Sequence, residues 1–359
     1  MNLPIAITTS FLVTLTLIPI VIKVFKSFDL LDQPNGRKIH RISTPSLGGI
    51  AVFFGLMVAL VISLPFTNLT DEKHFLVGVF LIFLLGVRDD LSSLQANHKL
   101  VVQVFAATLV VFFKGIKISG LNGLFGIDTF GWYFDELFTI FLIVIMTNAF
   151  NLIDGIDGLA GSIGLLISIT FCFLFTYSGH HFSAILSLAL AGAVLAFLIY
   201  NWYPSKVFMG DTGSMMLGFV LTVLFIRFLS VPLPESGQVS PVALVFSLFI
   251  LPTYDTSRVL LIRFFTGKHL LTPDRNHIHH VLLKLGYNHG QSTILLVGYN
   301  LILFLCVVTF QPIGELWLIS SMTFLTVSIG GILDKKIMKR EAARMARIYT
   351  SQMNISKTA

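Results

Sequence analysis

Hydrophobic residues in this chain fall into long runs that are separated by short polar stretches. A helix that crosses a membrane needs about 20 predominantly apolar residues, and runs near this length recur along the whole sequence. The pattern therefore predicts an all-α, polytopic integral membrane protein with about eleven transmembrane helices. The expected spans are residues 3–25, 47–66, 74–88, 100–113, 137–153, 158–178, 182–202, 214–230, 241–254, 292–311 and 315–333.

The composition agrees with this pattern. Hydrophobic residues make up 55% of the chain and charged residues 12%, where soluble domains carry about 25% charged residues. A soluble globular protein and a disordered chain are therefore both excluded. The two cysteines, Cys172 and Cys306, lie inside apolar runs, which argues against a disulfide framework or a thiolate metal cluster. The first apolar run is too long for the core of a signal peptide, so we expect a retained spanning helix.

Positive charges predict how the helices are oriented. An odd number of crossings places the two termini on opposite sides of the membrane. With the C-terminus inside, all but four of the 24 Lys and Arg residues lie on the inner side, as the positive-inside rule requires. We therefore predict an outer N-terminus and a cytoplasmic C-terminus. Residues 1–333 are expected to form a single transmembrane domain, and residues 334–359 a basic cytoplasmic tail on anionic lipid.

Seven aspartates occupy the loops that this topology places in the cytoplasm. Clustered carboxylates repel one another, and a hard divalent cation with oxygen ligands relieves the repulsion. Mg²⁺ typically binds one or two carboxylates together with substrate phosphates. The acidic loops therefore predict a magnesium site, with Mn²⁺ as the alternative ion, and a phosphate-bearing substrate. The seven residues are Asp89, Asp90, Asp154, Asp157, Asp211, Asp255 and Asp274.

The stretch NAFNLIDGIDGLAG, residues 148–161, repeats a polar residue at every third position. Asn148, Asn151, Asp154 and Asp157 would lie roughly on one face of a helix, and the glycines among them permit a tight turn. A turn with a purely structural role is one interpretation. A substrate-binding segment is the other, and it is the one we favour.

The stretch GDTGS, residues 210–214, opens the eighth expected span. Asp211 or Thr212 could serve only as the N-cap of that helix. A helix N-terminus with free N–H groups is also a site for phosphate. We favour the second interpretation because the stretch lies on the same predicted face as the other aspartates.

Three histidines follow the ninth expected span. His277, His279 and His280 could be interfacial residues or zinc ligands, but no cysteine accompanies them and their spacing is crowded for one tetrahedral site. Beside Arg275 they are better suited to contacting phosphate oxygens.

Several other classes of protein lose support because their motifs are absent. The sequence has no GxxxxGK[ST] phosphate loop, no GxSxG nucleophile elbow and no HExxH zinc helix. A secondary transporter is the chief alternative from another class. Its sites usually lie near the bilayer midplane, whereas the aspartates here gather at one face.

Five motifs in order resemble the polyprenyl-phosphate N-acetylhexosamine-1-phosphate transferase superfamily, over about residues 29–285. The resemblance implies transfer of a sugar 1-phosphate from a UDP-activated amino sugar to undecaprenyl phosphate, with release of UMP and with Mg²⁺. The motifs are RKIH with TPSLGG (37–49), the Asp89–Asp90 pair, NLIDGIDGLAG, VFMGDTGSMMLG and DRNHIHH.

The histidine motif also suggests a branch of that superfamily. The branch that acts on UDP-MurNAc-pentapeptide, for lipid I of peptidoglycan, carries three consecutive histidines followed by Phe. This chain instead has Ile278 between two of its histidines. It is therefore more similar to the branch that uses UDP-GlcNAc or a similar small UDP-sugar, as in lipopolysaccharide O-antigen or teichoic acid linkage synthesis, and the pentapeptide donor stays open.

The resemblance also implies roles for individual residues. It makes Asp89 and Asp90 the catalytic pair and Asp211 the main magnesium ligand, with Asp154 at the metal or in the nucleotide pocket. The expected substrate-binding residues are Asn151, Asp157, Asn201 and Phe208 for the nucleotide, and Arg41, Arg275, His277, His279 and His280.

The implied partners are a UDP-HexNAc donor, undecaprenyl phosphate and membrane lipids, without nucleic acid. A homodimer is left open beside a monomer. The implied location is the bacterial cytoplasmic membrane, as a multi-pass protein whose active site faces the cytoplasm.

Overall fold

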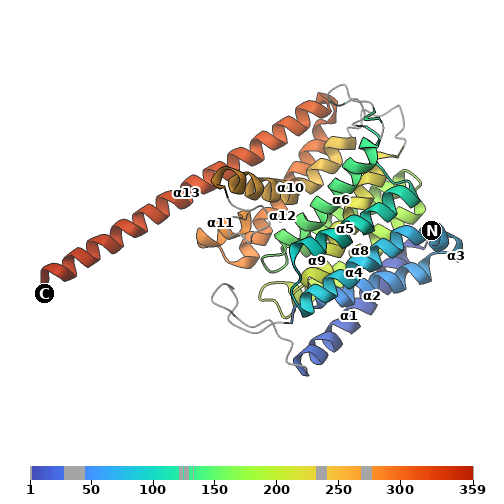
Figure 1. Cartoon of the computed structure of the whole chain (residues 1–359), viewed down its shortest axis with the longest axis horizontal. Helices are drawn as coiled ribbons and strands as arrows, with labels where there is room; N and C mark the ends of the chain where they lie inside the picture. Colours follow the sequence, from blue (N-terminus) through green and yellow to red (C-terminus); the bar gives the residue numbers. More distant parts are fainter. Residues whose placement is uncertain are drawn as a thin grey trace.

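The computed structural model describes residues 2–27, 45–120, 124, 129–131, 133–231, 241–267 and 277–358, with side chains along the last helix as far as residue 343. These residues form helices and connecting loops, and no strand occurs among them, so the predicted all-α class is confirmed (Figure 1). The helices are α1 (Leu3–Ser27), α2 (Gly48–Ser63), α3 (Phe66–Asp71), α4 (Lys73–Leu91), α5 (Ala96–Thr108, continued by a π-helical turn Leu109–Phe113), α6 (Phe134–Ile153), α7 (Leu159–Tyr177), α8 (His181–Asn201), α9 (Gly210–Leu229), α10 (Pro241–Thr266), α11 (Ile278–Lys284), α12 (His289–Phe310, then a 3₁₀ turn Gln311–Ile313) and α13 (Glu315–Thr358).

Each of the predicted apolar runs coincides with one long helix. In the described part of the chain, nine helices are long and apolar enough to cross a membrane, judged by length and composition. The remaining two predicted spans correspond to α2, which has 16 residues, and to α4, whose last turn contains the charged sequence Arg88-Asp89-Asp90. The expected tail from residue 334 does not start at a break, because α13 runs on continuously and leaves the body of the molecule (Figure 1).

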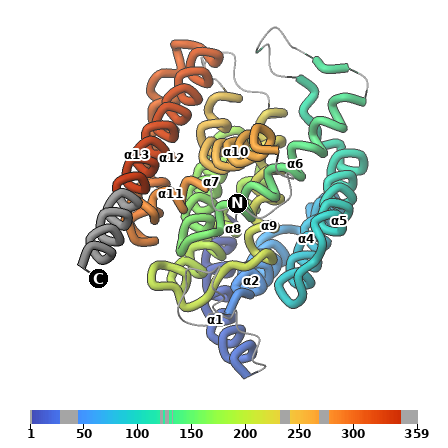
Figure 2. The backbone as a smooth tube through the Cα atoms, turned by 60° about the vertical axis from the view of Figure 1, so that its left-hand side comes forward, coloured from blue at the N-terminus to red at the C-terminus, as the bar shows by residue number. Residues whose placement is uncertain are grey.

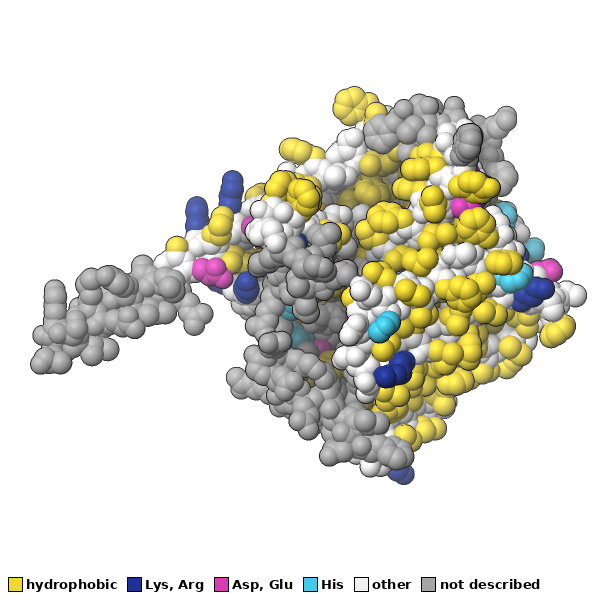
Figure 3. Space-filling model, in the orientation of Figure 1, with side chains coloured by type: hydrophobic (Ala, Val, Ile, Leu, Met, Phe, Trp, Pro, Cys, Tyr) yellow, Lys and Arg dark blue, Asp and Glu magenta, His cyan; other side chains and the backbone are white. Residues whose placement is uncertain are grey.

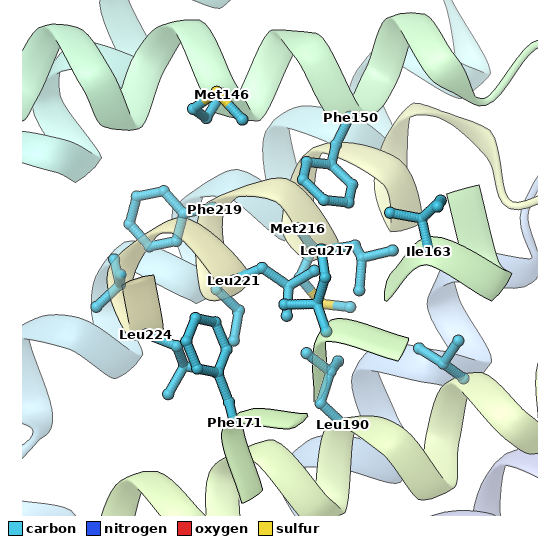
Figure 4. Packing of buried hydrophobic residues seen from close by; sticks show 14 of the residues in the cluster. Met146, Phe150, Ile163, Phe171, Leu190, Met216, Leu217, Phe219, Leu221 and Leu224 are labelled. Carbon is cyan, nitrogen blue, oxygen red and sulfur yellow. The ribbon is translucent and has the colours of Figure 1, made fainter. Parts of the chain in front are cut away.

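Helix α9 lies at the centre of the bundle. It packs against α2, α4, α6 and α7, and Figure 2 shows it among these helices. Figure 4 shows Phe150 of α6 near Met216 of α9, and Phe171 of α7 beside Leu221 and Leu224 farther along the same helix. In lipid such close packing supplies much of the association energy between helices. Apolar side chains also cover much of the outer surface (Figure 3), as a lipid-facing surface requires.

Glycines allow the first turn of α9 to approach its neighbours closely. A side chain on Gly86 of α4 would overlap the backbone of Thr212, and one on Gly49 of α2 would overlap the backbone of Gly213. Because Asp90 follows Gly86 by one helical turn, the same contact places the Asp90 carboxylate at the beginning of α9.

Candidate active site

The Asp90 side chain caps helix α9. Its Oδ1 accepts a hydrogen bond from the Asp211 N–H at 2.8 Å, and its Oδ2 accepts from the Thr212 N–H at 3.0 Å and from Thr212 Oγ1 at 2.6 Å. These are N–H groups that a helix N-terminus otherwise leaves unsatisfied. The cap of α9 is therefore supplied by a residue of α4. The Asp211 side chain does not cap the helix.

Lys99 joins the other two carboxylates of this region. Its Nζ donates to Asp211 Oδ2 at 2.8 Å and forms an ion pair with Asp89 Oδ2. The second oxygen of Asp89 accepts a hydrogen bond from the Leu94 N–H at 2.6 Å, and the residue is buried. Asp89, Asp90 and Asp211 thus form one cluster, here called the aspartate cluster, around the adjoining ends of α4 and α9.

Asp154 and Asn151 extend the cluster from the end of α6. Ser214 Oγ of α9 donates to Asn151 Oδ1 at 3.3 Å. Burial, together with the neighbouring carboxylates of Asp211 and Asp90, raises the pKa of Asp154 well above its usual range. The carboxylates around Asp154 therefore disfavour its ionised form.

Asp157 ties the turn after α6 to two other segments. Its Oδ2 accepts from the Ser205 N–H at 3.2 Å, and its Oδ1 lies 3.2 Å from His289 Nδ1 at the start of α12. Thr293 Oγ1 also donates to the Asp157 carbonyl at 2.8 Å. The side chain is buried, so it holds the walls of the site together.

Asn201 fastens the same turn to the loop between α8 and α9. Its Oδ1 accepts from the Gly158 N–H, and its Nδ2 donates to the Val207 carbonyl, both at 2.9 Å. In the next residues of that loop, the Phe208 N–H donates to Pro45 O at 2.8 Å and its carbonyl accepts from the Gly48 N–H at 2.9 Å. The first, third and fourth motifs are thereby brought into contact around the base of α9.

The histidines lie at the start of α11 and in its first turn. His277 Nδ1 is 2.7 Å from Asp255 Oδ2, and the Ile278 N–H donates to Asp255 Oδ1 at 2.6 Å, so α10 anchors the start of α11. The rings of His279 and His280 lie 4.3 Å apart between centroids. His279 packs directly on Gly155, where a side chain would overlap its imidazole.

The His279 imidazole is 1% exposed, and neither ring nitrogen has a hydrogen-bond partner among the described residues. Burial lowers the pKa of His279 to about 3. A buried polar group without a partner is costly, so this ring is available to a ligand that enters beside the turn of residues 154–158.

The carboxylate oxygens of this region are suitable ligands for a hard cation. No group of three or more His, Cys, Asp or Glu side chains in the described ranges forms a complete metal cage. Mg²⁺ needs fewer protein ligands, because waters and substrate phosphates complete its octahedron. Asp211 and Asp154, whose carboxyl groups interact electrostatically, fit this requirement, and the Lys99 ammonium already pairs with Asp211.

Two of the sequence-predicted residues, Arg41 and Arg275, lie outside the described residues, as does Asp274. The others lie around the base of α9 or on α11. The sequence reasoning missed two residues at the site: Lys99, which was counted only as an inner-side charge, and His289, which pairs with Asp157. Asp255, one of the seven predicted aspartates, pairs with His277. A lysine nine residues after the Asp89–Asp90 pair was the available signal for Lys99.

Loss of the Asp90 cap should destabilise the protein. Asp90→Ala leaves two backbone N–H groups and the Thr212 hydroxyl without their acceptor, which costs about 1–3 kcal/mol of unfolding free energy. We expect a lower thermal midpoint for the purified variant in detergent. Asp71→Ala, which removes an exposed carboxylate at the end of α3, is the control, and an equal shift in both variants would refute the capping role.

The buried His279 should make stability depend on pH. The unfolded chain takes up this proton near pH 6.5 and the folded protein only near pH 3, so the unfolding free energy falls as the pH drops below 6.5. The slope approaches about 1.4 kcal/mol per pH unit. Between pH 7 and pH 5, the thermal midpoint of His279→Gln should fall by less than that of the wild type. The exposed His98→Gln variant should follow the wild type, and identical profiles for all three would contradict this assignment.

Comparison with known proteins agrees with the geometry. Residues 73–229, which run from α4 to the end of α9, match the sequence model of glycosyl transferase family 4. A Bacillus subtilis protein named as a probable undecaprenyl-phosphate N-acetylglucosaminyl 1-phosphate transferase is 33% identical over 82% of each chain.

Two further relatives carry similar names. A decaprenyl-phosphate N-acetylglucosaminephosphotransferase of Mycolicibacterium smegmatis is 31% identical over 75% of this chain and 72% of its own. An undecaprenyl-phosphate α-N-acetylglucosaminyl 1-phosphate transferase of Escherichia coli K12 is 29% identical over 76% of this chain and 74% of its own. The chain therefore belongs to glycosyl transferase family 4, within its branch of polyprenyl-phosphate N-acetylglucosaminyl 1-phosphate transferases.

Proposed function

We infer that this protein transfers N-acetylglucosamine 1-phosphate from a UDP-sugar to undecaprenyl phosphate and releases UMP. The observation that carries this inference is the aspartate cluster, which joins α4 to α9 with Lys99 at its centre. The names of the bacterial relatives support the same reaction. Phosphoryl transfer depends on alignment and charge neutralisation more than on covalent chemistry, and a rigid cluster of charged groups serves both needs.

Asp211 and Asp154 are the residues we propose to hold Mg²⁺. The Asp211 carboxylate takes no part in capping α9, and Asp154 lies in its electrostatic field. The bound ion would supply charge neutralisation for the diphosphate of the donor. Lys99 holds the carboxylates of Asp211 and Asp89 in place before substrates arrive, because its ammonium group contacts both.

Asp89 faces the acceptor in this proposal. A lipid phosphate is already largely ionised near neutral pH, since the second pKa of a phosphate monoester is about 6. It therefore needs orientation more than deprotonation, and Asp89 orients it or takes up the remaining proton for a direct in-line attack. Asp90 acts as a positioning residue, because its three hydrogen bonds hold the beginning of α9.

The histidines of α11 and the turn of residues 154–158 would line the donor side. His279 offers two unpaired ring nitrogens beside Gly155, and Asp255 fixes the ring of His277. Imidazole groups in this position can donate to phosphate oxygens. Asn201 and Asp157 then act by shaping the nucleotide pocket, because their polar atoms are engaged in holding its loops.

The membrane arrangement that fits this reaction has eleven spans, an outer N-terminus and an active site at the cytoplasmic face of the bacterial inner membrane. The donor is soluble and cytoplasmic, whereas the isoprenoid tail of the acceptor must stay in lipid. A cluster at the ends of several helices is within reach of both. The product would begin the membrane stage of a cell-surface polysaccharide such as O-antigen or a teichoic acid linkage.

A donor panel tests the proposal. Purified protein is incubated with undecaprenyl phosphate, Mg²⁺ and one of several UDP-sugars, and UMP is quantified. We expect UMP from UDP-GlcNAc, none without the lipid, and none with EDTA. Release of UMP from UDP-MurNAc-pentapeptide alone would move the protein to the peptidoglycan branch. Solute uptake by proteoliposomes, with no UMP from any donor, would favour the transporter alternative.

A further inference from the structure

A large apolar groove borders α11 and contains none of the residues of the aspartate cluster. It runs between α10, α11, α12 and α13 and has a volume of about 600 Å³, which is within the usual range of about 300–1,000 Å³ for ligand sites. Its walls include Leu251 of α10, Leu282 of α11, Leu295 of α12 and Leu333 of α13. Leu295 is 47% exposed, so the groove opens towards the lipid.

One end of this groove is positively charged. Lys336, Lys339 and Arg340 of α13 line it, directly after the apolar part of that helix. Neither lysine has an acidic partner within the portion of the chain that the structure describes. Asp334 is occupied by an ion pair with Arg258. Figure 3 shows dark-blue side chains standing along α13 where it leaves the body.

We propose that this groove binds an anionic phospholipid of the surrounding bilayer, distinct from the polyprenyl acceptor. The headgroup phosphate lies against Lys336, Lys339 and Arg340, and an acyl chain lies along the leucine-lined wall. The charge of the rim favours an anionic lipid over a zwitterionic one, since each basic residue near a lipid surface contributes to anionic binding. The apolar length of the groove favours a lipid over a free phosphate or a nucleotide.

The position of α11 links this lipid to the catalytic side. Ile278 and Leu282 face the groove, whereas His277 contacts Asp255 and His279 contacts Gly155. Arg340 also donates a hydrogen bond to the carbonyl of Leu285, just after α11. A bound lipid therefore packs against Ile278 and Leu282 of α11 and stabilises the position of this helix, which carries the histidines.

Lipid binding can be measured on the full-length protein without any reference to turnover. The protein is reconstituted in phosphatidylcholine nanodiscs, phosphatidylglycerol is titrated in, and bound lipid is counted by native mass spectrometry. We expect tighter binding of phosphatidylglycerol than of phosphatidylcholine. The double variant Lys336→Gln/Lys339→Gln should bind phosphatidylglycerol about 25-fold more weakly. Each lysine then contributes about fivefold, which corresponds to about 1 kcal/mol. Lys335→Gln, on an exposed residue that does not line the groove, should change the binding less than twofold.

A second matched pair tests the apolar part. Leu295→Trp fills the groove and should reduce bound phosphatidylglycerol at least tenfold, whereas Ile294→Trp, exposed on the adjacent face of α12, should leave it unchanged. Equal binding of both phospholipids, or equal effects of the groove and control variants, would overturn the proposal. Displacement of phosphatidylglycerol by undecaprenyl phosphate would also overturn it, because the groove would then belong to the acceptor.

Discussion

Asp211→Asn lowers the rate of UMP release by roughly 10³-fold or more, a loss at least as large as that of one preorganised electrostatic group, while the protein keeps its fold. The reason is that Asn cannot hold a hard cation as a carboxylate does. Folding survives because the Asp211 side chain does not cap α9; its backbone N–H donates to Asp90 in the variant as in the wild type. Turnover is measured as a function of Mg²⁺ concentration, and the thermal midpoint is measured in parallel.

Two further results decide how this loss is interpreted. The apparent Mg²⁺ affinity should fall in Asp211→Asn, and Asp71→Asn, at an exposed site on α3, should behave as the wild type. Near-normal turnover of Asp211→Asn would show that its carboxylate is dispensable. A large drop in the thermal midpoint would instead assign the carboxylate a structural role.

Asp89→Asn should reduce turnover by roughly 10²–10⁴-fold, the usual contribution of a positioned acid–base group. The wild type should also release no UMP when UDP-GlcNAc is supplied without lipid. Both oxygens of Asp89 are engaged, by Leu94 and by Lys99, and the residue is buried. This environment suits a group that orients an acceptor better than one that must leave its partners to attack phosphorus.

The competing mechanism makes Asp89 a covalent nucleophile. It requires a burst of one UMP per enzyme from the donor alone and a phospho-sugar adduct on the protein. Quenched reactions examined by mass spectrometry distinguish the two. An adduct on Asp89 would contradict direct transfer, and strict dependence of UMP on the lipid would support it.

Much of the fold could be predicted because each transmembrane helix is specified by its own apolar run. The one-sided gathering of Asp89 and Asp211 also followed, since the lengths of intervening spans return loops to the same face. The continuity of α13 through residue 334 was not evident, because a change from apolar to basic composition resembles a boundary even when the helix continues.

The contacts within the site could not be predicted from the sequence because they join segments that are far apart along the chain. Asp90 caps α9 through the N–H of Asp211, which lies 121 residues later in the chain, so the local residues Asp211 and Thr212 were the only cap candidates that the sequence indicated. Lys99, in the first turn of α5, lies 112 residues from Asp211, and a lysine gives no sign in the sequence of such a distant partner. Asn201 was predicted to bind the nucleotide, and the contacts of its amide with Gly158 and Val207 were not evident from the sequence.

The fate of the β-phosphate tests the proposed reaction most directly. UDP-GlcNAc labelled with ³²P at the β-phosphate is incubated with the purified protein, undecaprenyl phosphate and Mg²⁺, and the lipid and aqueous phases are counted. Transfer of sugar 1-phosphate predicts that the label enters the lipid phase in equal amount to the UMP released, and that Asp211→Asn abolishes both. Label that appears in soluble UDP, with the sugar alone on the lipid, would contradict it.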